Sequence, residues 1–260
     1  MDQENGRPVA LEPVAKAALS VARRLMECGA RADIVHQGSS LVAKGLGARH
    51  VDIRSGYASL CITVASGGET VTRMCEVGRI GVNHRMDHAV RSLARRVGKD
   101  LQTPDAIERE LAGLDRSVPS HPLWLCALAA GIACASFGRL FGIDWASFLP
   151  VAAAGALGQT TRHVLAARGT NPFVAAAIVA ALASGLCGIA SRHLGSATVN
   201  AAMIAAVLFL VPGVPALNAQ SDIMEGHPTL GSARTVSVIM MLMFIATGVL
   251  VARTVLGVPA

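Results

Sequence analysis

Residues 193–221 read HLGSATVNAAMIAAVLFLVPGVPALNAQS and contain no Asp, Glu, Lys or Arg. The run is 29 residues long, and a helix needs about 20 mostly apolar residues to cross the hydrocarbon core of a bilayer. Near its end, Pro212 and Pro215 enclose Gly213. Each proline lacks a backbone donor and crowds the carbonyl four residues earlier, so it interrupts a helix. The stretch therefore predicts a membrane span that is broken near its C-terminal end.

Four further uncharged runs predict four further spans, because soluble helices need a charged outer face. This argument disfavours the alternative of five buried helices in a soluble core. The uncharged runs cover 117–138, 145–161, 169–191 and 235–252. With their flanks, the five predicted spans are about 120–140, 145–166, 170–191, 196–217 and 233–254. Small residues recur every fourth position at Ala127, Gly131 and Ala135, a spacing that favours close helix packing in lipid.

The first half of the chain has a different composition. Residues 1–120 hold 17 of the 23 Lys and Arg residues and 14 of the 17 Asp and Glu residues. The composition of the whole chain, 52% hydrophobic and 15% charged residues, is therefore an average over two parts of very different composition. The composition predicts a charged N-terminal domain over residues 1–116 and a transmembrane domain over 117–260, which is an all-α bundle of five helices.

The N-terminal domain is predicted to be α+β. Apolar residues follow a helical period over 13–29 and 33–46, and Gly29 suits the end of the first helix. Runs rich in Val, Ile and Thr, separated by Ser-Gly and Gly-Gly turns, predict three strands. The strands cover 49–54, 58–65 and 70–77, and two more helices are predicted over 85–97 and 104–114. We expect an antiparallel sheet covered by helices.

The N-terminus decides the predicted orientation. The loop arginines divide equally between the two sides, so the positive-inside rule gives no answer. Residues 1–10 contain no apolar core of a signal peptide, so we expect the basic N-terminal domain to stay in the cytoplasm. Its charge, within a chain of net charge +6, suits a face near anionic lipid. Five spans then place the C-terminus in the periplasm.

No pattern in the chain points to an enzyme, a cofactor or a metal. The six cysteines form no C-x-x-C pair and are expected to act as small buried hydrophobic residues. His84 and His88 are spaced i, i+4, which suits either a metal-binding face or, more simply, a solvated helix face. The glycines at 67 and 68 lack the lysine of a phosphate-binding loop and indicate a hairpin turn. The scarcity of aromatic residues argues against nucleic-acid binding.

The broken span supplies the candidate substrate pathway. Freed backbone groups at membrane depth are tolerated only where they are buried in protein or line a watery cavity, and broken helices often form transporter sites. Asn218 and Asp222 are spaced i, i+4 and would face one cavity if the helix resumes. The alternative is a helix that ends at the interface, with both side chains in water. The other candidate pathway residues are Pro212, Gly213, Pro215, Asn200 and Arg162; Arg162 suits either a carboxylate substrate or an interfacial anchor.

These residues resemble the bacterial threonine/serine exporter family. The resemblance rests on the LVPGVPALNA segment at 210–219 with Asp222 and Gly226, and on three N-terminal motifs. Those motifs are the CGA sequence at 28–30, GGETVTR at 67–73 and RIGVN at 79–83, and PLWL at 122–125 is also similar. One difference is that the family often has Gly-Ala-Glu-Thr after the first helix, whereas this chain has Gly29-Ala30-Arg31-Ala32.

The resemblance implies a multi-pass bacterial inner-membrane protein that exports small polar metabolites, either threonine and serine or succinate-type dicarboxylates. The five-helix length matches the YjjP-type subunit of the family's split form, which implies a smaller membrane subunit as partner. Lipid and a small metabolite are the other expected partners. Association with further copies of the same chain as a homo-oligomer is an alternative that the sequence does not decide. Two alternatives are a membrane-anchored regulatory or scaffold protein, whose N-terminal domain carries the activity, and a membrane-bound enzyme. An anchor needs no proline-broken polar span, and an enzyme needs a nucleophile and base that the sequence does not show.

Overall fold

The computed structural model describes residues 10–97, 99, 103–119 and 121–258. The described residues form two compact units. The first comprises those of Met1–Pro119 together with Val214–Thr235, and the second those of Ser120–Gly213 and Val236–Ala260. Residues 1–9 of the predicted N-terminal domain and residue 120 of the first predicted span lie outside the described residues. The boundary predicted near residue 116 remains a prediction.

The N-terminal part of the first unit has the predicted order of elements. Two helices come first, α1 (Leu11–Glu27) and α2 (Ala32–Gly45). Three strands follow, β1 (His50–Ser55), β2 (Ser59–Ser66) and β3 (Glu69–Glu76), and then α3 (His84–Val97) and α4 (Pro104–Ser117). The strands pair antiparallel in the order β1-β2-β3. The predicted small antiparallel sheet covered by helices is confirmed.

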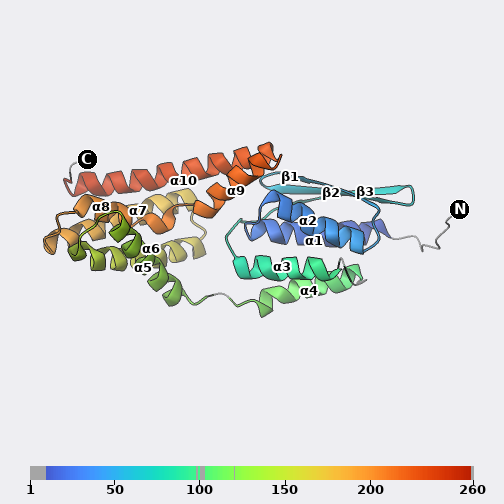
Figure 1. Cartoon of the computed structure of the whole chain (residues 1–260), viewed down its shortest axis with the longest axis horizontal. Coiled ribbons are helices and arrows are strands. Elements are labelled where there is room, and N and C mark those ends of the chain that lie inside the picture. The colour runs from blue at the N-terminus through green and yellow to red at the C-terminus, as the bar shows by residue number, and fades with distance from the viewer. Residues whose placement is uncertain (1–9, 98, 100–102, 120, 259–260) are drawn as a thin grey trace. The chain divides into compact units, whose positions relative to one another are not determined.

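These elements form three layers, which Figure 1 shows as the sheet, the pair α1 and α2, and the pair α3 and α4. The alternate residues Leu60, Ile62 and Val64 of β2 are fully buried, because successive side chains of a strand point to opposite faces. Helix α1 contacts both the sheet and α4. Its many buried alanines, Ala17 and Ala18 among them, suit a helix that is covered on several sides.

The first unit also contains a helical hairpin from near the C-terminus. It is made of α9 (Gly213–Met224) and the first two turns of α10 (Pro228–Val255). Leu230 of α10 is 1% exposed and belongs to the same hydrophobic core as α1, α2 and the sheet. A Cβ atom at Gly231 would lie 2.8 Å from the carbonyl oxygen of Ala219. This close approach packs the two helices of the hairpin against each other.

The second unit is helical. Its helices are α5 (Leu123–Leu140), α6 (Trp145–Ala167), α7 (Pro172–His193), α8 (Val199–Ala205), the 3₁₀ turn η1 (Leu208–Leu210) and the remainder of α10. Helix α6 packs against both α5 and α7. A Cβ atom at Gly131 of α5 would lie only 2.3 Å from the carbonyl oxygen of Ala152 in α6. The predicted close helix packing through small residues is therefore present at Gly131.

Polar side chains fix the loops at one end of this unit. The carboxylate of Asp144 accepts hydrogen bonds from the N–H of Ser147, in the first turn of α6, from the hydroxyl of Ser196 and from the N–H of Ala197. Desolvation acts to raise the pKa of Asp144, but these hydrogen bonds outweigh it and lower the pKa to about 2. The carboxylate therefore ties the start of α6 to the turn before α8.

Five membrane-spanning helices are not confirmed. Within the described residues, α5, α7 and α10 are each long and apolar enough to cross a membrane, and the bent pair Val199–Leu210 and Gly213–Met224 adds a fourth if it is one span. Helix α6 is not among them. It is long enough, but its C-terminal half contains the polar run from Gln159 to His163, which lowers its hydropathy. A count of charged residues alone does not register Gln159, Thr160 and Thr161, which are polar but uncharged.

Gly131→Ala should destabilise the second unit by about 1–3 kcal/mol, because the added methyl group overlaps the Ala152 carbonyl. Alanine is the better helix former by about 1 kcal/mol, so any loss must come from this contact. The matched control is Gly185→Ala in α7, whose Cβ would meet only Ala252 at 3.8 Å. Thermal unfolding of the full chain in detergent measures both. Equal midpoints for the two variants would contradict the packing described here.

Candidate functional site

The helix breaks where the prolines predict. Helical structure ends with η1 at Leu210 and resumes at Gly213. Between them Val211 is extended, and the N–H of Gly213 donates to the carbonyl of Val211 at 2.9 Å. Pro215 lies in the first turn of α9, where the missing N–H costs nothing. The break is therefore confined to Val211 and Pro212.

The segment before the break packs in the second unit. The ring of Phe209 in η1 lies against α6, because a Cβ atom at Gly158 would come within 2.7 Å of its Cζ. The same added atom would lie 3.2 Å from Ala183 of α7. Phe209 contacts both apolar clusters of this unit. An aromatic side chain thus holds the end of η1 between α6 and α7.

The segment after the break contacts the turn between α1 and α2. The N–H of Ala32 donates to Asp222 Oδ1 at 2.8 Å. The other oxygen of Asp222 accepts from Arg234, whose second nitrogen donates to the carbonyl of Ala30 at 2.9 Å. Asp222 is 0% exposed and Arg234 is 5% exposed. We call this arrangement of Asp222, Arg234, Ala30 and Ala32 the clasp.

Two further side chains extend these contacts. Asn218, one turn before Asp222, donates from Nδ2 to the carbonyl of Gly29 at 2.7 Å. Arg31 forms an ion pair with Glu225, which follows α9, at 2.8 Å. Gly29 has a φ of +83° and ends α1, as the sequence predicts. Its left-handed conformation directs the chain into the turn that the hairpin contacts.

The first N–H groups of α2 explain why a carboxylate lies here. The residue before α2, Arg31, makes no side-chain cap hydrogen bond, so the first turn of α2 needs another acceptor. Asp222 supplies it from α9. A helix N-terminus carries partial positive charge and stabilises a carboxylate, and Arg234 adds a full positive charge on the other side.

A pair of histidines lies beside the clasp. The rings of His36 in α2 and His227 before α10 meet edge to face, with 4.7 Å between their centroids. His36 Nε2 is also 3.1 Å from the hydroxyl of Ser55. Desolvation, followed by the charge of His227, lowers the pKa of His36, although Asp52, Asp222 and Asp33 act in the opposite direction. Because His227 belongs to the hairpin, contact with the hairpin favours the neutral form of the His36 ring.

The candidate pathway residues fall into three places. Pro212, Gly213 and Pro215 lie at the break, and Asn218 and Asp222 both contact the α1–α2 turn. Asn200 of α8 and Arg162 of α6 are exposed positions of the second unit. Arg162 has no hydrogen-bond or ion-pair partner among the described residues. The i, i+4 spacing of Asn218 and Asp222 does bring them to one surface, but protein backbone occupies that surface.

Sequence reasoning missed Arg234 and Glu225. In the sequence, Arg234 is one of the loop arginines that divide equally between the two sides of the membrane. A signal was present, because the second half of the chain has only nine Asp, Glu, Lys and Arg residues and three of them, Asp222, Glu225 and Arg234, lie within 222–234. Opposite charges so close together in an apolar chain indicate an ion pair.

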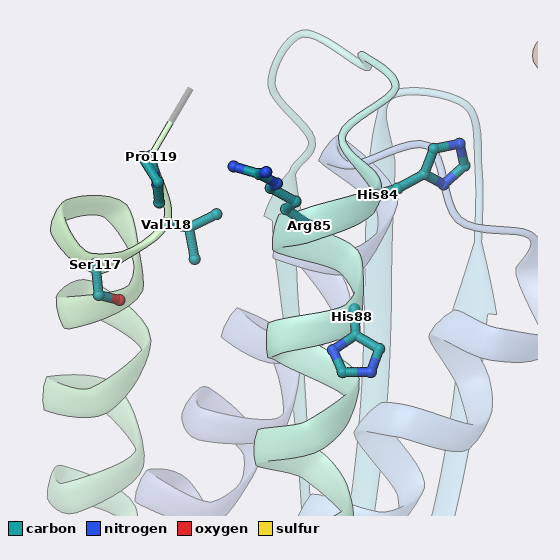
Figure 2. A pocket seen from close by; sticks show the side chains of 6 residues that line it. All are labelled: His84, Arg85, His88, Ser117, Val118 and Pro119. Carbon is teal, nitrogen blue, oxygen red and sulfur yellow. The ribbon is translucent and has the colours of Figure 1, made fainter. Parts of the chain in front are cut away.

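The histidine and cysteine patterns do not assemble a metal site in the part of the chain that the structure describes, where no group of three or more His, Cys, Asp or Glu residues is placed to hold an ion. His84 and His88 line a shallow hollow of about 470 Å³ together with Arg85 and the end of α4. Figure 2 shows Arg85 extending toward Val118 and Pro119. Burial raises the pKa of the Cys28 thiol to about 11, which leaves it unreactive.

Comparison with known proteins gives a family and several relatives. The model of a family described as "Putative threonine/serine exporter" matches residues 16–256. A Klebsiella aerogenes protein named "Probable succinate transporter subunit YjjP" is 26% identical over 245 residues, covering 94% of both chains. The Escherichia coli protein of the same name is 26% identical, covering 90% of this chain and 91% of its own. No solved structure matches.

The histidine pair generates a pH prediction. His36 has a lowered pKa in the folded chain, so its contribution to stability is complete above its unfolded pKa of about 6.5 and is lost as the pH falls through and below that value. In His36→Gln the decline of the unfolding midpoint between pH 8 and pH 5.5 should be smaller than in the unmodified chain. Thermal unfolding of the full chain at both pH values measures this.

The control for this experiment is His50→Gln, at an exposed position of β1, which should leave the pH dependence unchanged. An undiminished decline in His36→Gln would show that His36 does not sense the docked hairpin.

Proposed function

The chain belongs to the threonine/serine exporter family, and on that premise we propose that it is one subunit of a two-component exporter of small polar metabolites. Family membership makes it a multi-pass transporter of the inner membrane. Threonine and serine are the substrates suggested by the family's description, and succinate-type dicarboxylates those suggested by the relatives' names. The word subunit in those names supports a partner, which we propose to be the smaller membrane subunit of the split form.

The broken span is the observation that supports this function best. Its two pieces are together long and apolar enough to cross a membrane, and they are interrupted at Val211 and Pro212. An interrupted backbone is tolerated at membrane depth only in protein or beside water. In secondary transporters such breaks bring backbone groups and helix ends to the substrate. We therefore propose that substrate passes beside Pro212, Gly213 and Pro215.

Arg162 and Asn200 are the polar side chains of the second unit that we propose for this pathway. A guanidinium binds a carboxylate through two parallel hydrogen bonds, and every proposed substrate carries a carboxylate. Arg162 follows the polar residues that begin at Gln159. Asn218 and Asp222 remain proposed contacts to substrate or to a coupling proton. Since both are bonded to the α1–α2 turn in this structure, they would serve that role only in a state in which the hairpin leaves the turn.

We further propose that the N-terminus is cytoplasmic and the C-terminus periplasmic. This orientation requires an odd number of crossings, which five spans provide if α6 crosses as well as the broken pair. The competing interpretation, an anchored regulatory or scaffold protein, gains no support from the first unit. That unit includes α9, the second half of the broken span. A helix that only anchors a domain in the membrane would not need to form part of that domain.

Efflux of labelled threonine, serine and succinate tests the function. Cells without exporters of this family should release at least one of these solutes faster when they contain this chain together with the smaller subunit. Neither subunit alone should suffice. Release of none of the three by cells containing both subunits in the membrane would refute the proposed substrates.

The break itself is tested by Pro212→Ala combined with Pro215→Ala. These changes restore two backbone donors and favour a continuous helix, so export should fall about tenfold or more, a loss of about 1.4 kcal/mol of transition-state stabilisation. Pro172→Ala is the matched control, because Pro172 lies in the first turn of α7 and bends nothing. Export should be compared per molecule of membrane-inserted protein. Full export by the double variant would exclude the break as part of the pathway.

A further inference from the structure

The clasp places two opposite charges out of water at the end of the broken span. Asp222 lies in the last turn of α9, and Arg234 lies in the second turn of α10. Both side chains are almost completely buried. Removal of an ion from water is costly and is repaid only if hydrogen bonds satisfy the remaining donors and acceptors. Such a pair is therefore poor evidence for stability alone, and its geometry needs another explanation.

The hydrogen bonds of the clasp connect two helices to one turn. Arg234 donates to Asp222 through one nitrogen and to the carbonyl of Ala30 through the other. Asp222 accepts from the N–H of Ala32. The guanidinium therefore fixes the carboxylate and the α1–α2 turn at the same time. A lysine, with one nitrogen, cannot reproduce this fork.

The hairpin is firmly attached to the first unit at other points as well. Leu230 lies in the hydrophobic core, Gly231 allows close packing against Ala219, and Asn218 bonds to Gly29. Helix α9 then leads back to Gly213, the first residue after the break. Whatever fixes α9 on the α1–α2 turn thus also fixes one side of the break.

We propose that Arg234 is a positioning residue for transport. It holds the carboxylate of Asp222 at the N-terminus of α2, and through it holds α9 on the α1–α2 turn. The N-terminal domain then acts as the fixed support for one side of the broken span. This inference rests on the proposed function, because it assigns Arg234 a role in export through the break.

The test separates positioning from folding with a charge-neutral pair. Arg234→Met alone leaves a buried carboxylate without its partner, so that variant should fold poorly. The combination Asp222→Asn with Arg234→Met has no buried charge, so it should fold close to normally, but the amide beside Ala32 is neutral and is no longer held in place by Arg234. If Arg234 positions the hairpin, this folded double variant should lose at least about nine-tenths of export per inserted molecule. Asp222→Asn alone keeps the bond from Arg234 to the carbonyl of Ala30 and should lose much less, whereas an equal loss in both variants would place the effect on Asp222 itself. Arg234→Lys keeps the charge and should retain part of the export.

Amide hydrogen exchange at Ala32, measured on the full chain in detergent, reports the clasp independently of transport. Exchange should be faster in the double variant than in the unmodified chain. The matched control neutralises the ion pair between Asp87 and Arg91 within α3, through Asp87→Asn with Arg91→Met. That control should change neither export nor exchange at Ala32.

Full export by the folded double variant, or unchanged exchange at Ala32, would overturn the proposal. If the unmodified chain with its partner exports none of the solutes, the proposed function fails instead. The exchange at Ala32 would then show separately whether Arg234 holds the hairpin on the turn.

Discussion

Burial of Asp222 and Arg234 is the constraint that fixes where the hairpin lies in the first unit. Each charge is removed from water, so each must find its partner and its hydrogen bonds within the protein. The hydrogen bonds that satisfy both bring α9, α10 and the α1–α2 turn together. Segments nearly 200 residues apart in the chain therefore meet at one fixed geometry. Apolar packing of Leu230 strengthens this attachment but is less directional.

The second unit follows a different constraint. Apolar burial does not drive helix association in lipid, so helices pack through close backbone approach at small residues. Gly131 against Ala152 and Gly248 against Ala177 are the closest such approaches, each leaving no room for a Cβ atom. Large side chains cover other glycines, and the ring of Phe209 fills the space above Gly158. A rigid aromatic thus holds one side of the break, and an ion pair holds the other.

The sequence predicts local features well and distant partners poorly. The helices and strands of the N-terminal domain follow from periodicity and from turn residues such as Gly29, because those signals act within a few residues. The break at Pro212 is predicted for the same reason. The contact of Asp222 with Ala32 spans 190 residues, and no local pattern encodes such a pairing. The predicted fourth span runs to about residue 217, whereas by their contacts the residues from Val214 onward belong with the first unit.

The α1–α2 turn and the hairpin supply each other's missing partners. Arg31 makes no side-chain cap hydrogen bond at the start of α2, and the acceptor for the N–H of Ala32 comes from Asp222 of α9. Arg31 in turn pairs with Glu225, which follows α9. Both sides of this contact therefore depend on acidic groups at the end of one helix, α9. The turn and the hairpin consequently have to be read as one structural element, with the chemistry of each side set by the other.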